Sequence, residues 1–118
     1  MTFQVKEFIN EKYSKAVNIL KDNLKEHYHV FYGVRLSEIL FPASEYGTDD
    51  FFREFESINS VILPLTIFDL KELKPIMIIS FDIMSDPRLL EGTGIVVIEC
   101  NALSDLLINN NIAVLYKS

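Results

Sequence analysis

Two apolar runs lie close together in the middle of this chain and restrict its fold more than any other feature. They read VILPLTIFDL (61–70) and PIMIISFDI (75–83), and only KELK separates them. Near-continuous apolar runs of strand length are typical of strands covered on both faces. The short link predicts that the two strands are antiparallel neighbours. Pro64 cannot donate to a strand ladder, so it predicts an edge, a bulge or a break there.

The N-terminal half is predicted to alternate helix and strand. Apolar residues at spacings of three and four indicate a helix over 4–26, with Thr2 as its N-cap. Residues 28–36 are rich in aromatic and β-branched types, which favours a strand. Ser37 can begin a short helical turn. Pro, Gly, Ser and Asp indicate a loop over 41–50.

A short helix follows that loop, in the segment DDFFREFESIN, with Asp49 or Asp50 as its expected cap. Its Phe51 and Phe52 are adjacent and cannot both face the core, so one of them can contribute to an exposed apolar patch. Core packing is the alternative role for these aromatic residues.

The C-terminal part is predicted to hold a loop, two strands and a helix. The loop covers 85–94, the strands cover 95–99 and 112–116, and the helix covers 101–110 with Asn101 as its cap. The whole order is helix, strand, short helix, three strands, helix, strand. This order favours an α+β or α/β fold, a mixed β-sheet flanked by helices in a single domain over 1–118. The last helix would make a right-handed crossover.

Charge and cysteine content restrict the environment and the partners. The chain has 118 residues, with Asp+Glu 17 against Lys+Arg 11 and a net charge of -6. This acidic balance argues against direct nucleic-acid binding, because such proteins usually carry a basic excess. A single cysteine, Cys100, fits a reducing compartment, so we expect a cytoplasmic protein without a membrane span. A local basic face stays open for the lysines of the first helix, Lys12, Lys15, Lys21 and Lys25.

Three segments resemble an uncharacterised bacterial domain family related to PD-(D/E)XK nucleases. YHVFYGVRLSEIL is similar to the family segment VRLADLL, and DLKELKPIMIISFD is similar to its hairpin, D-P-x-T-L-K-P-x-x-x-I-E-L-D. LSDLLINNNIAVLY is similar to its final helix and strand, and the three pieces occur in the same order over about two thirds of the chain. The resemblance implies a restriction-endonuclease-like core.

The same resemblance implies that most of the catalytic acids are missing. Matching outward from the shared L-K-P places Pro64 at the first acid and Ser80 at the family Glu, while Asp82 matches the Asp two residues later. Arg88 is present downstream, but the family His is not. Phosphodiester cleavage in this fold needs Mg²⁺ or Mn²⁺ held by two or more carboxylates. The resemblance therefore implies a degenerate, non-catalytic nuclease fold.

Other residues could still form a site. Asp82 with Glu99, and with Asp69 as a third acid, could build a relocated Mg²⁺ or Mn²⁺ site for a divergent nuclease. The alternative is that these acids end their strands and face water. His27 and His29 share a strand face and could begin a metal site, or they are surface residues. Cys100 could be a nucleophile beside a helix N-terminus, or a small core residue.

Three functions follow from these patterns. The first is a non-catalytic protein-interaction module, with a role near bacterial or phage nucleic-acid processing suggested by analogy. The second is the divergent nuclease. The third is an acidic mimic of DNA that blocks a basic protein, and it needs acids along one face: Glu38, Glu45, Asp49, Asp50, Glu54 and Glu56. If the Pro64 strand lies at an edge, it could also pair with a second copy in a homodimer.

Overall fold

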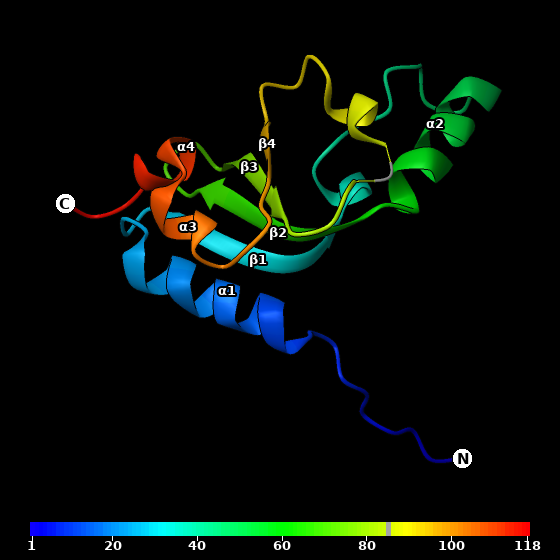
Figure 1. Cartoon of the computed structure of the whole chain (residues 1–118). Helices are drawn as coiled ribbons and strands as arrows, with labels where there is room; N and C mark the ends of the chain where they lie inside the picture. Colours follow the sequence, from blue (N-terminus) through cyan, green and yellow to red (C-terminus); the bar gives the residue numbers. More distant parts are fainter. Residues whose placement is uncertain (85) are drawn as a thin grey trace.

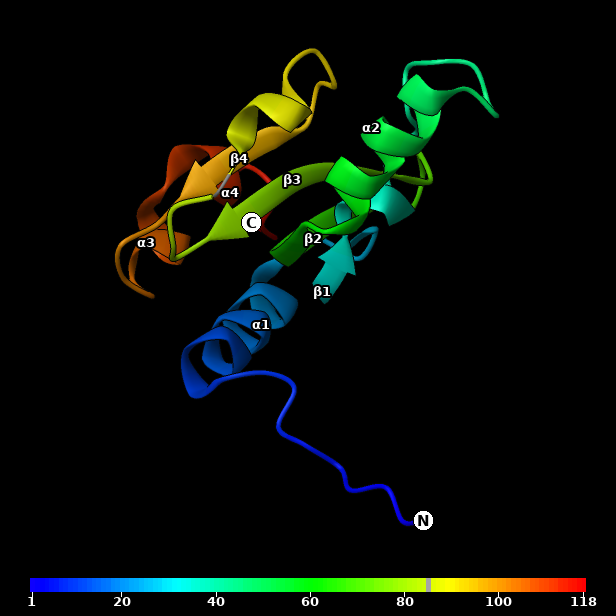
Figure 2. The ribbon, with the colours of Figure 1, turned by 90° about the vertical axis from the view of Figure 1, so that its right-hand side faces the viewer.

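The computed structural model describes residues 1–84 and 86–118, whose strands form one mixed sheet (Figures 1 and 2). The strand order is β1-β2-β3-β4, with antiparallel pairing except between β3 and β4, which are parallel. The strands are β1 (Tyr28–Arg35), β2 (Ile62–Asp69), β3 (Lys74–Ser80) and β4 (Val96–Glu99). The α-helices are α1 (Glu11–Asn23), α2 (Asp49–Asn59), α3 (Asp105–Ile108) and α4 (Asn110–Ala113). The α+β class and the mixed sheet flanked by helices are confirmed.

Two separate apolar clusters hold the sheet. Strand residues on one face, such as Leu65 and Ile67, are buried with residues of α1, α3 and α4. Ile78 faces the other side, where it is buried with Leu36 and Ile58. Because neighbouring strand residues point to opposite faces, both faces of the two central strands are covered, as the apolar runs predict. None of the helices formed by the described residues has the length and apolarity needed to cross a membrane.

The β2–β3 hairpin is confirmed, but Pro64 does not lie at a sheet edge. β2 lies between β1 and β3, so edge pairing of this strand with a second copy is wrong. The ladder with β3 ends at the Leu65–Ile79 pair, one residue short of Pro64. On the other side, the register with β1 omits the pair of Gly33 and Pro64. A residue without an N–H thus occupies the point where the ladders lapse, in agreement with the predicted break.

The first helix is shorter than predicted. It begins at Glu11, because the Asn10 side chain accepts a hydrogen bond from the Tyr13 N–H at 2.9 Å and caps it. Thr2 is therefore not the cap. The residues before Asn10 are non-helical and run away from the body (Figure 1), and Val5 is fully exposed. Phe8 contacts Tyr32 and Ile9 packs against the core, but the apolar residues before them have no surface to pack against, so periodicity alone does not form a helix.

The last predicted strand is also wrong. Residues 112–116 contain the end of α4 and a single bridge between Tyr116 and Leu24. The predicted helix over 101–110 is divided, because the Asn109 side chain accepts from the N–H groups of Asn111 and Ile112 and starts α4. The terminal helix–strand order is therefore replaced by two short helices.

Four local predictions need correction too. Thr48 caps α2 rather than Asp49 or Asp50, and Ser104 rather than Asn101 precedes α3. The parallel connection from β3 to β4 runs through residues 81–95, so the last helix is not a crossover. The predicted loop over 85–94 contains a 3-10 helix, Pro87–Leu90. Ser85 lies outside the described residues. A second 3-10 helix, Leu36–Glu38, confirms the turn expected near Ser37.

Candidate functional site

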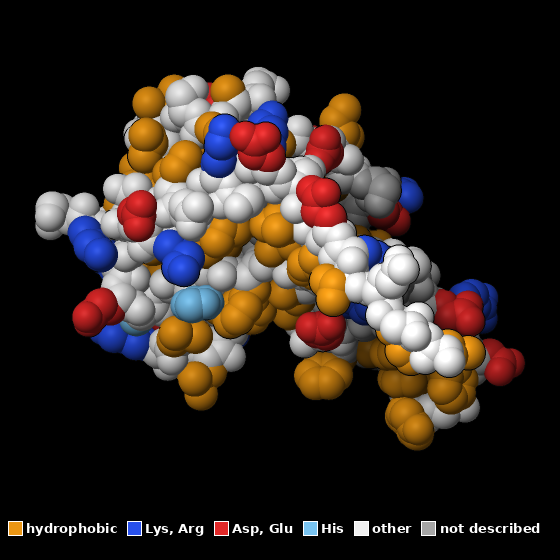
Figure 3. Space-filling view, turned by 90° about the horizontal axis from the view of Figure 1, so that it is seen from below, with side chains coloured by type: hydrophobic (Ala, Val, Ile, Leu, Met, Phe, Trp, Pro, Cys, Tyr) orange, Lys and Arg blue, Asp and Glu red, His pale blue; other side chains and the backbone are white. Residues whose placement is uncertain are grey.

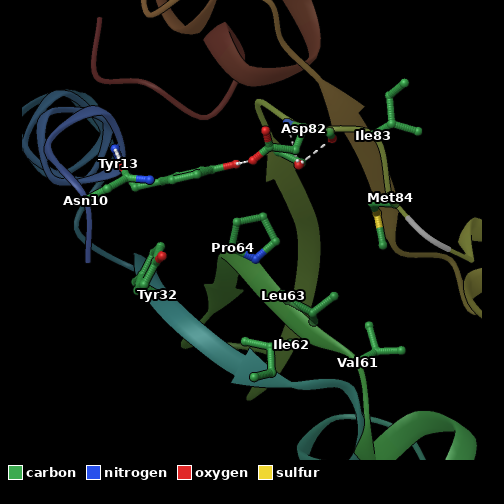
Figure 4. Close-up of a pocket in the computed structure, with 11 residues that line it drawn as sticks. Asn10, Tyr13, Tyr32, Val61, Ile62, Leu63, Pro64, Asp82, Ile83 and Met84 are labelled. Atoms are coloured by element: carbon green, nitrogen blue, oxygen red, sulfur yellow. Dashed lines mark hydrogen bonds between the residues drawn. The ribbon is translucent and has the colours of Figure 1, made fainter. Parts of the chain in front are cut away.

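A hollow of about 360 Å³ opens where β2 and β3 meet the start of α1 (Figure 4). It brings together Pro64, Ser80 and Asp82, the three positions that the hairpin resemblance singles out. Proximity follows from the register, since Pro64 and Ser80 each lie one residue beyond the Leu65–Ile79 pair. The other lining residues are Asn10, Tyr13, Tyr32, Val61, Ile62, Leu63, Ile83 and Met84. The lining is mostly apolar and aromatic, with one carboxylate.

Ser80 is held inside its own turn. Its side chain is buried, and its Oγ donates to the Asp82 carbonyl at 2.6 Å while accepting from the Asp82 N–H at 3.0 Å. The Ser80 carbonyl accepts from the Cys100 N–H at 2.7 Å, which joins the ends of β3 and β4. These bonds give the hydroxyl a structural role at the position that the hairpin resemblance aligns with a family carboxylate.

Tyr13 of α1 connects the helix to the end of β3. Its hydroxyl donates to Asp82 Oδ2 at 3.0 Å (Figure 4) and accepts from the Phe81 N–H at 2.9 Å. The residue is 4% exposed, and burial raises the pKa of the hydroxyl above its ordinary value, although the hydrogen bond from the Phe81 N–H partly opposes the rise. The tyrosine therefore stays a neutral hydrogen-bond donor. Sequence reasoning missed it, because its helical spacing indicates only a core residue.

Few polar side chains of this hollow are available to contact a ligand or a metal ion. Asp82 is exposed and its Oδ2 is bound to Tyr13, so its other oxygen could accept a hydrogen bond from a ligand. Pro64 has no side-chain oxygen, and the Ser80 hydroxyl is fully engaged. A single carboxylate in an otherwise neutral hollow is a weak ligand set for a divalent cation.

The other candidate acids separate in space. Glu99 pairs with Ser80 across β3 and β4, so its backbone lies at the same end of the sheet as Asp82. Asp69 lies at the opposite end, because β2 runs antiparallel to β3 and Asp69 pairs with Lys74. Burial raises the pKa of Asp69, but the N–H groups of Glu72 and Lys71 donate to its carboxylate. Together the contributions lower this pKa below its ordinary value. Asp69 therefore cannot complete a site with Asp82.

The histidines and the cysteine occupy ordinary structural positions. The His27 ring lies against Tyr28, with centroids 4.1 Å apart, and the His29 ring lies against Phe31 at 4.6 Å. Within residues 1–84 and 86–118, no group of three or more His, Cys, Asp or Glu side chains is arranged to hold a metal ion. Cys100 is buried, and burial, followed by the nearby Asp105 carboxylate, raises the pKa of its thiol. The thiol is thereby kept protonated and less reactive.

A second feature is the aromatic surface of α2, which we define as Tyr46, Phe51, Phe52 and Phe55. Their rings contact one another, with centroid distances of 4.9 Å for Tyr46–Phe51 and 5.4 Å for Phe51–Phe52. Tyr46 is 80% exposed, Phe52 51% and Phe55 39%. Figure 1 shows α2 at the end of the molecule far from α3 and α4. Of the residues in α2, only Ile58 is buried.

Acidic residues surround this aromatic surface. Glu45, Asp49, Asp50, Glu54 and Glu56 lie on or next to α2, and Arg53 is the one basic residue of the helix. Arg53 is already paired with Asp50 at 2.7 Å. Hydrogen bonds from the Ser44 hydroxyl and N–H lower the pKa of Glu54, so this carboxylate is firmly ionised. The surface therefore combines exposed aromatic rings with net negative charge.

Comparisons with family models, curated proteins and solved structures found no match to this chain. The resemblance of its hairpin to nuclease-related domains stays a prediction. Its function has to be inferred from the contacts, burial and charges of its own side chains.

Proposed function

We propose that this domain is a non-catalytic protein-interaction module, built on a degenerate restriction-endonuclease-like core, and that it binds its partner through the aromatic surface of α2. The observation that carries this proposal is the group of exposed, mutually contacting rings on that helix. Exposed aromatic residues grouped in one place are typical of interaction surfaces, where they supply large contact area at low entropic cost.

The charges around the rings define the kind of partner. The acids next to the aromatic surface outnumber Arg53, whose guanidinium is already paired. The complementary surface is an apolar groove on another protein, bordered by Lys and Arg side chains. The rings would enter the groove, while the acids would orient the encounter and make its rate depend on salt.

The hairpin supports the non-catalytic part of the proposal. The hollow at its end holds a proline and an engaged serine where cleavage would need carboxylates. Asp82 is tied to Tyr13, which fixes α1 on the sheet. A position that serves metal chemistry in related folds serves the packing of helix on sheet here. A role in bacterial or phage nucleic-acid processing rests on analogy alone.

The alternative function, an acidic mimic of DNA, would use other side chains of α2. A mimic binds through its carboxylates, so removal of the rings would change little and high salt would abolish binding. The exposed rings favour the interaction module. Substitution of rings and of acids separates the two ideas.

The experiment compares partner capture by three forms of the tagged domain in its native host. The first is the unchanged chain, and the second carries Phe52→Ser and Phe55→Ser, both at exposed positions. The control carries Ile108→Ser and Val114→Ser, which also remove exposed apolar side chains but lie in or beside the distant α3 and α4. Matching thermal unfolding curves would establish that all three are folded.

We expect a stoichiometric protein that the unchanged chain and the control retain and the α2 variant loses. Moderate salt should weaken the complex without abolishing it, because apolar contacts persist when charges are screened. Retention by the α2 variant would overturn the proposed surface. Loss of binding only after Asp49→Lys and Asp50→Lys, with the ring variant unaffected, would establish the mimic instead. Failure to capture any protein, even after chemical cross-linking, would count against an interaction module.

A further inference from the structure

A second hollow lies at the opposite end of α1 and carries positive charge. It measures about 250 Å³ and is lined by Lys21, Leu24, Lys25, Glu26, Tyr28, His29, Val30 and Lys117. We call it the basic hollow. Three lysines and a histidine face one glutamate, in a chain whose net charge is -6. At the left of Figure 3, basic side chains, with acidic ones between them, lie around a histidine next to an apolar hollow in the middle of that face.

The structure brings the third lysine to this place from the far end of the sequence. The N–H of Lys25 donates to the Leu115 carbonyl at 3.0 Å, and the N–H of Lys117 donates to the Asn23 carbonyl at 2.8 Å. Leu24 and Tyr116 form the bridge between these two bonds. Leu24 and Leu115 are both buried, so the backbone that carries Lys25 and Lys117 is anchored in the core. The fold therefore places both lysines at the same hollow, one from each segment.

The positive charges are not neutralised within the domain. In the described part of the chain, none of the ammonium groups of Lys21, Lys25 and Lys117 forms a salt bridge. The Lys25 ammonium donates to the Val114 carbonyl at 3.3 Å, which leaves its charge in place. Like charges that converge on a concave surface repel one another, and an anion in the hollow would relieve that repulsion.

We propose that the basic hollow binds the phosphate group of a small organic phosphate. Ammonium groups are effective point-charge donors to phosphate oxygens. The half-buried Tyr28 ring supplies apolar surface for the carbon part of the ligand. The hollow is a confined feature of about 250 Å³, a size that suits a small molecule. A small ligand is therefore the occupant, rather than a nucleic-acid strand.

The test is titration of the whole domain with pyrophosphate at constant ionic strength, followed by amide chemical shifts in NMR. The variants are Lys25→Gln and Lys117→Gln, which remove one charge each from exposed side chains. The control is Lys15→Gln, an exposed lysine of α1 that lies about 12 Å along the helix from its last residue, Asn23. Unchanged thermal unfolding would show that the variants keep the fold.

We expect saturable shifts at Tyr28, His29 and Lys117, with affinity about fivefold weaker in each hollow variant and changed less than about twofold in Lys15→Gln. Equal weakening by all three substitutions would show general charge screening and overturn the site. Shifts that never saturate would do the same. A single-stranded oligonucleotide that binds more tightly than pyrophosphate, with affinity rising with length, would overturn the small ligand and assign the surface to nucleic acid.

Discussion

Replacement of Tyr13 by phenylalanine removes the oxygen atom that joins α1 to the end of β3. The ring itself is buried and keeps its packing in the variant, so the effect isolates the hydroxyl. Two hydrogen bonds are lost, one donated to Asp82 and one accepted from the Phe81 N–H. A bond to a charged group contributes about 1.5–3 kcal/mol, and an orphaned N–H costs about 1–3 kcal/mol.

Water reduces both the loss from the missing bond to Asp82 and the cost of the unpaired Phe81 N–H. Asp82 is exposed and Phe81 is only partly buried, so water can replace part of what the hydroxyl supplied. We therefore expect Tyr13→Phe to lower the free energy of unfolding by about 2 kcal/mol. In a domain of 118 residues this corresponds to a fall in Tm of about 8 °C. The assay is urea unfolding followed by circular dichroism.

A double-mutant cycle assigns the loss to the right partner. Asp82→Ala in the Tyr13→Phe background should cost about 1 kcal/mol less than it does alone, because the two side chains share one bond. Tyr32→Phe is the matched control, since Tyr32 lines the same hollow and its hydroxyl makes no hydrogen bond to the described residues. A Tyr13→Phe effect below about 0.5 kcal/mol, or equal to that of Tyr32→Phe, would refute the reasoning.

Three further predictions concern the backbone and one buried hydroxyl. Gly33→Ala should destabilise by about 1.5 kcal/mol in urea unfolding, because φ is 78° there; Phe8→Ala should not rescue it, although the new Cβ would lie 2.7 Å from the mobile end of Phe8. Leu73→Gly should stabilise by about 0.5 kcal/mol, since Leu73 has φ 61° in the hairpin turn; a loss of stability would contradict this. Burial raises the pKa of Tyr116 from 10.0 to about 12, so its contribution is complete below pH 10 and is lost as the pH rises towards 12. Between those two pH values, the free energy of unfolding should therefore fall more for the unchanged chain than for Tyr116→Phe. Equal falls in the two proteins would show that the Tyr116 hydroxyl does not cause the loss.

The sequence determined the elements whose signals are local. The β2–β3 hairpin follows from two apolar runs and a short link, and the ladder lapses at Pro64 because a proline has no N–H. The segment DDFFREFESIN forms α2, as its spacing predicts, and some of its rings stay exposed because adjacent residues cannot face the same way. These properties depend on neighbours in the chain, so they can be read without knowing the fold.

Helix bounds predicted from apolar periodicity were wrong where a capping side chain starts the helix at another residue. Asn10 and Asn109 each start a helix by accepting backbone N–H bonds, and this shortened α1 and divided the last helix. Apolar spacing alone could not reveal it, because spacing does not report whether a surface is present for the residues to pack against. The missing final strand has a related cause: Ile112 in α4 and Leu115 in the turn after it are both buried, which satisfies the same apolar pattern without a strand.

Only the tertiary structure decided which distant residues meet. Tyr13 reaches Asp82 across 69 positions of sequence, and the C-terminal segment places Lys117 beside Lys25. Such contacts depend on how the helices close over the sheet, and the sequence carries no local mark of them. The sequence therefore sets which residue types are present. Packing decides how they group into the hydrogen-bonded end of the β2–β3 hairpin and into the basic hollow, because burial of the apolar faces sets where each polar side chain reaches the surface.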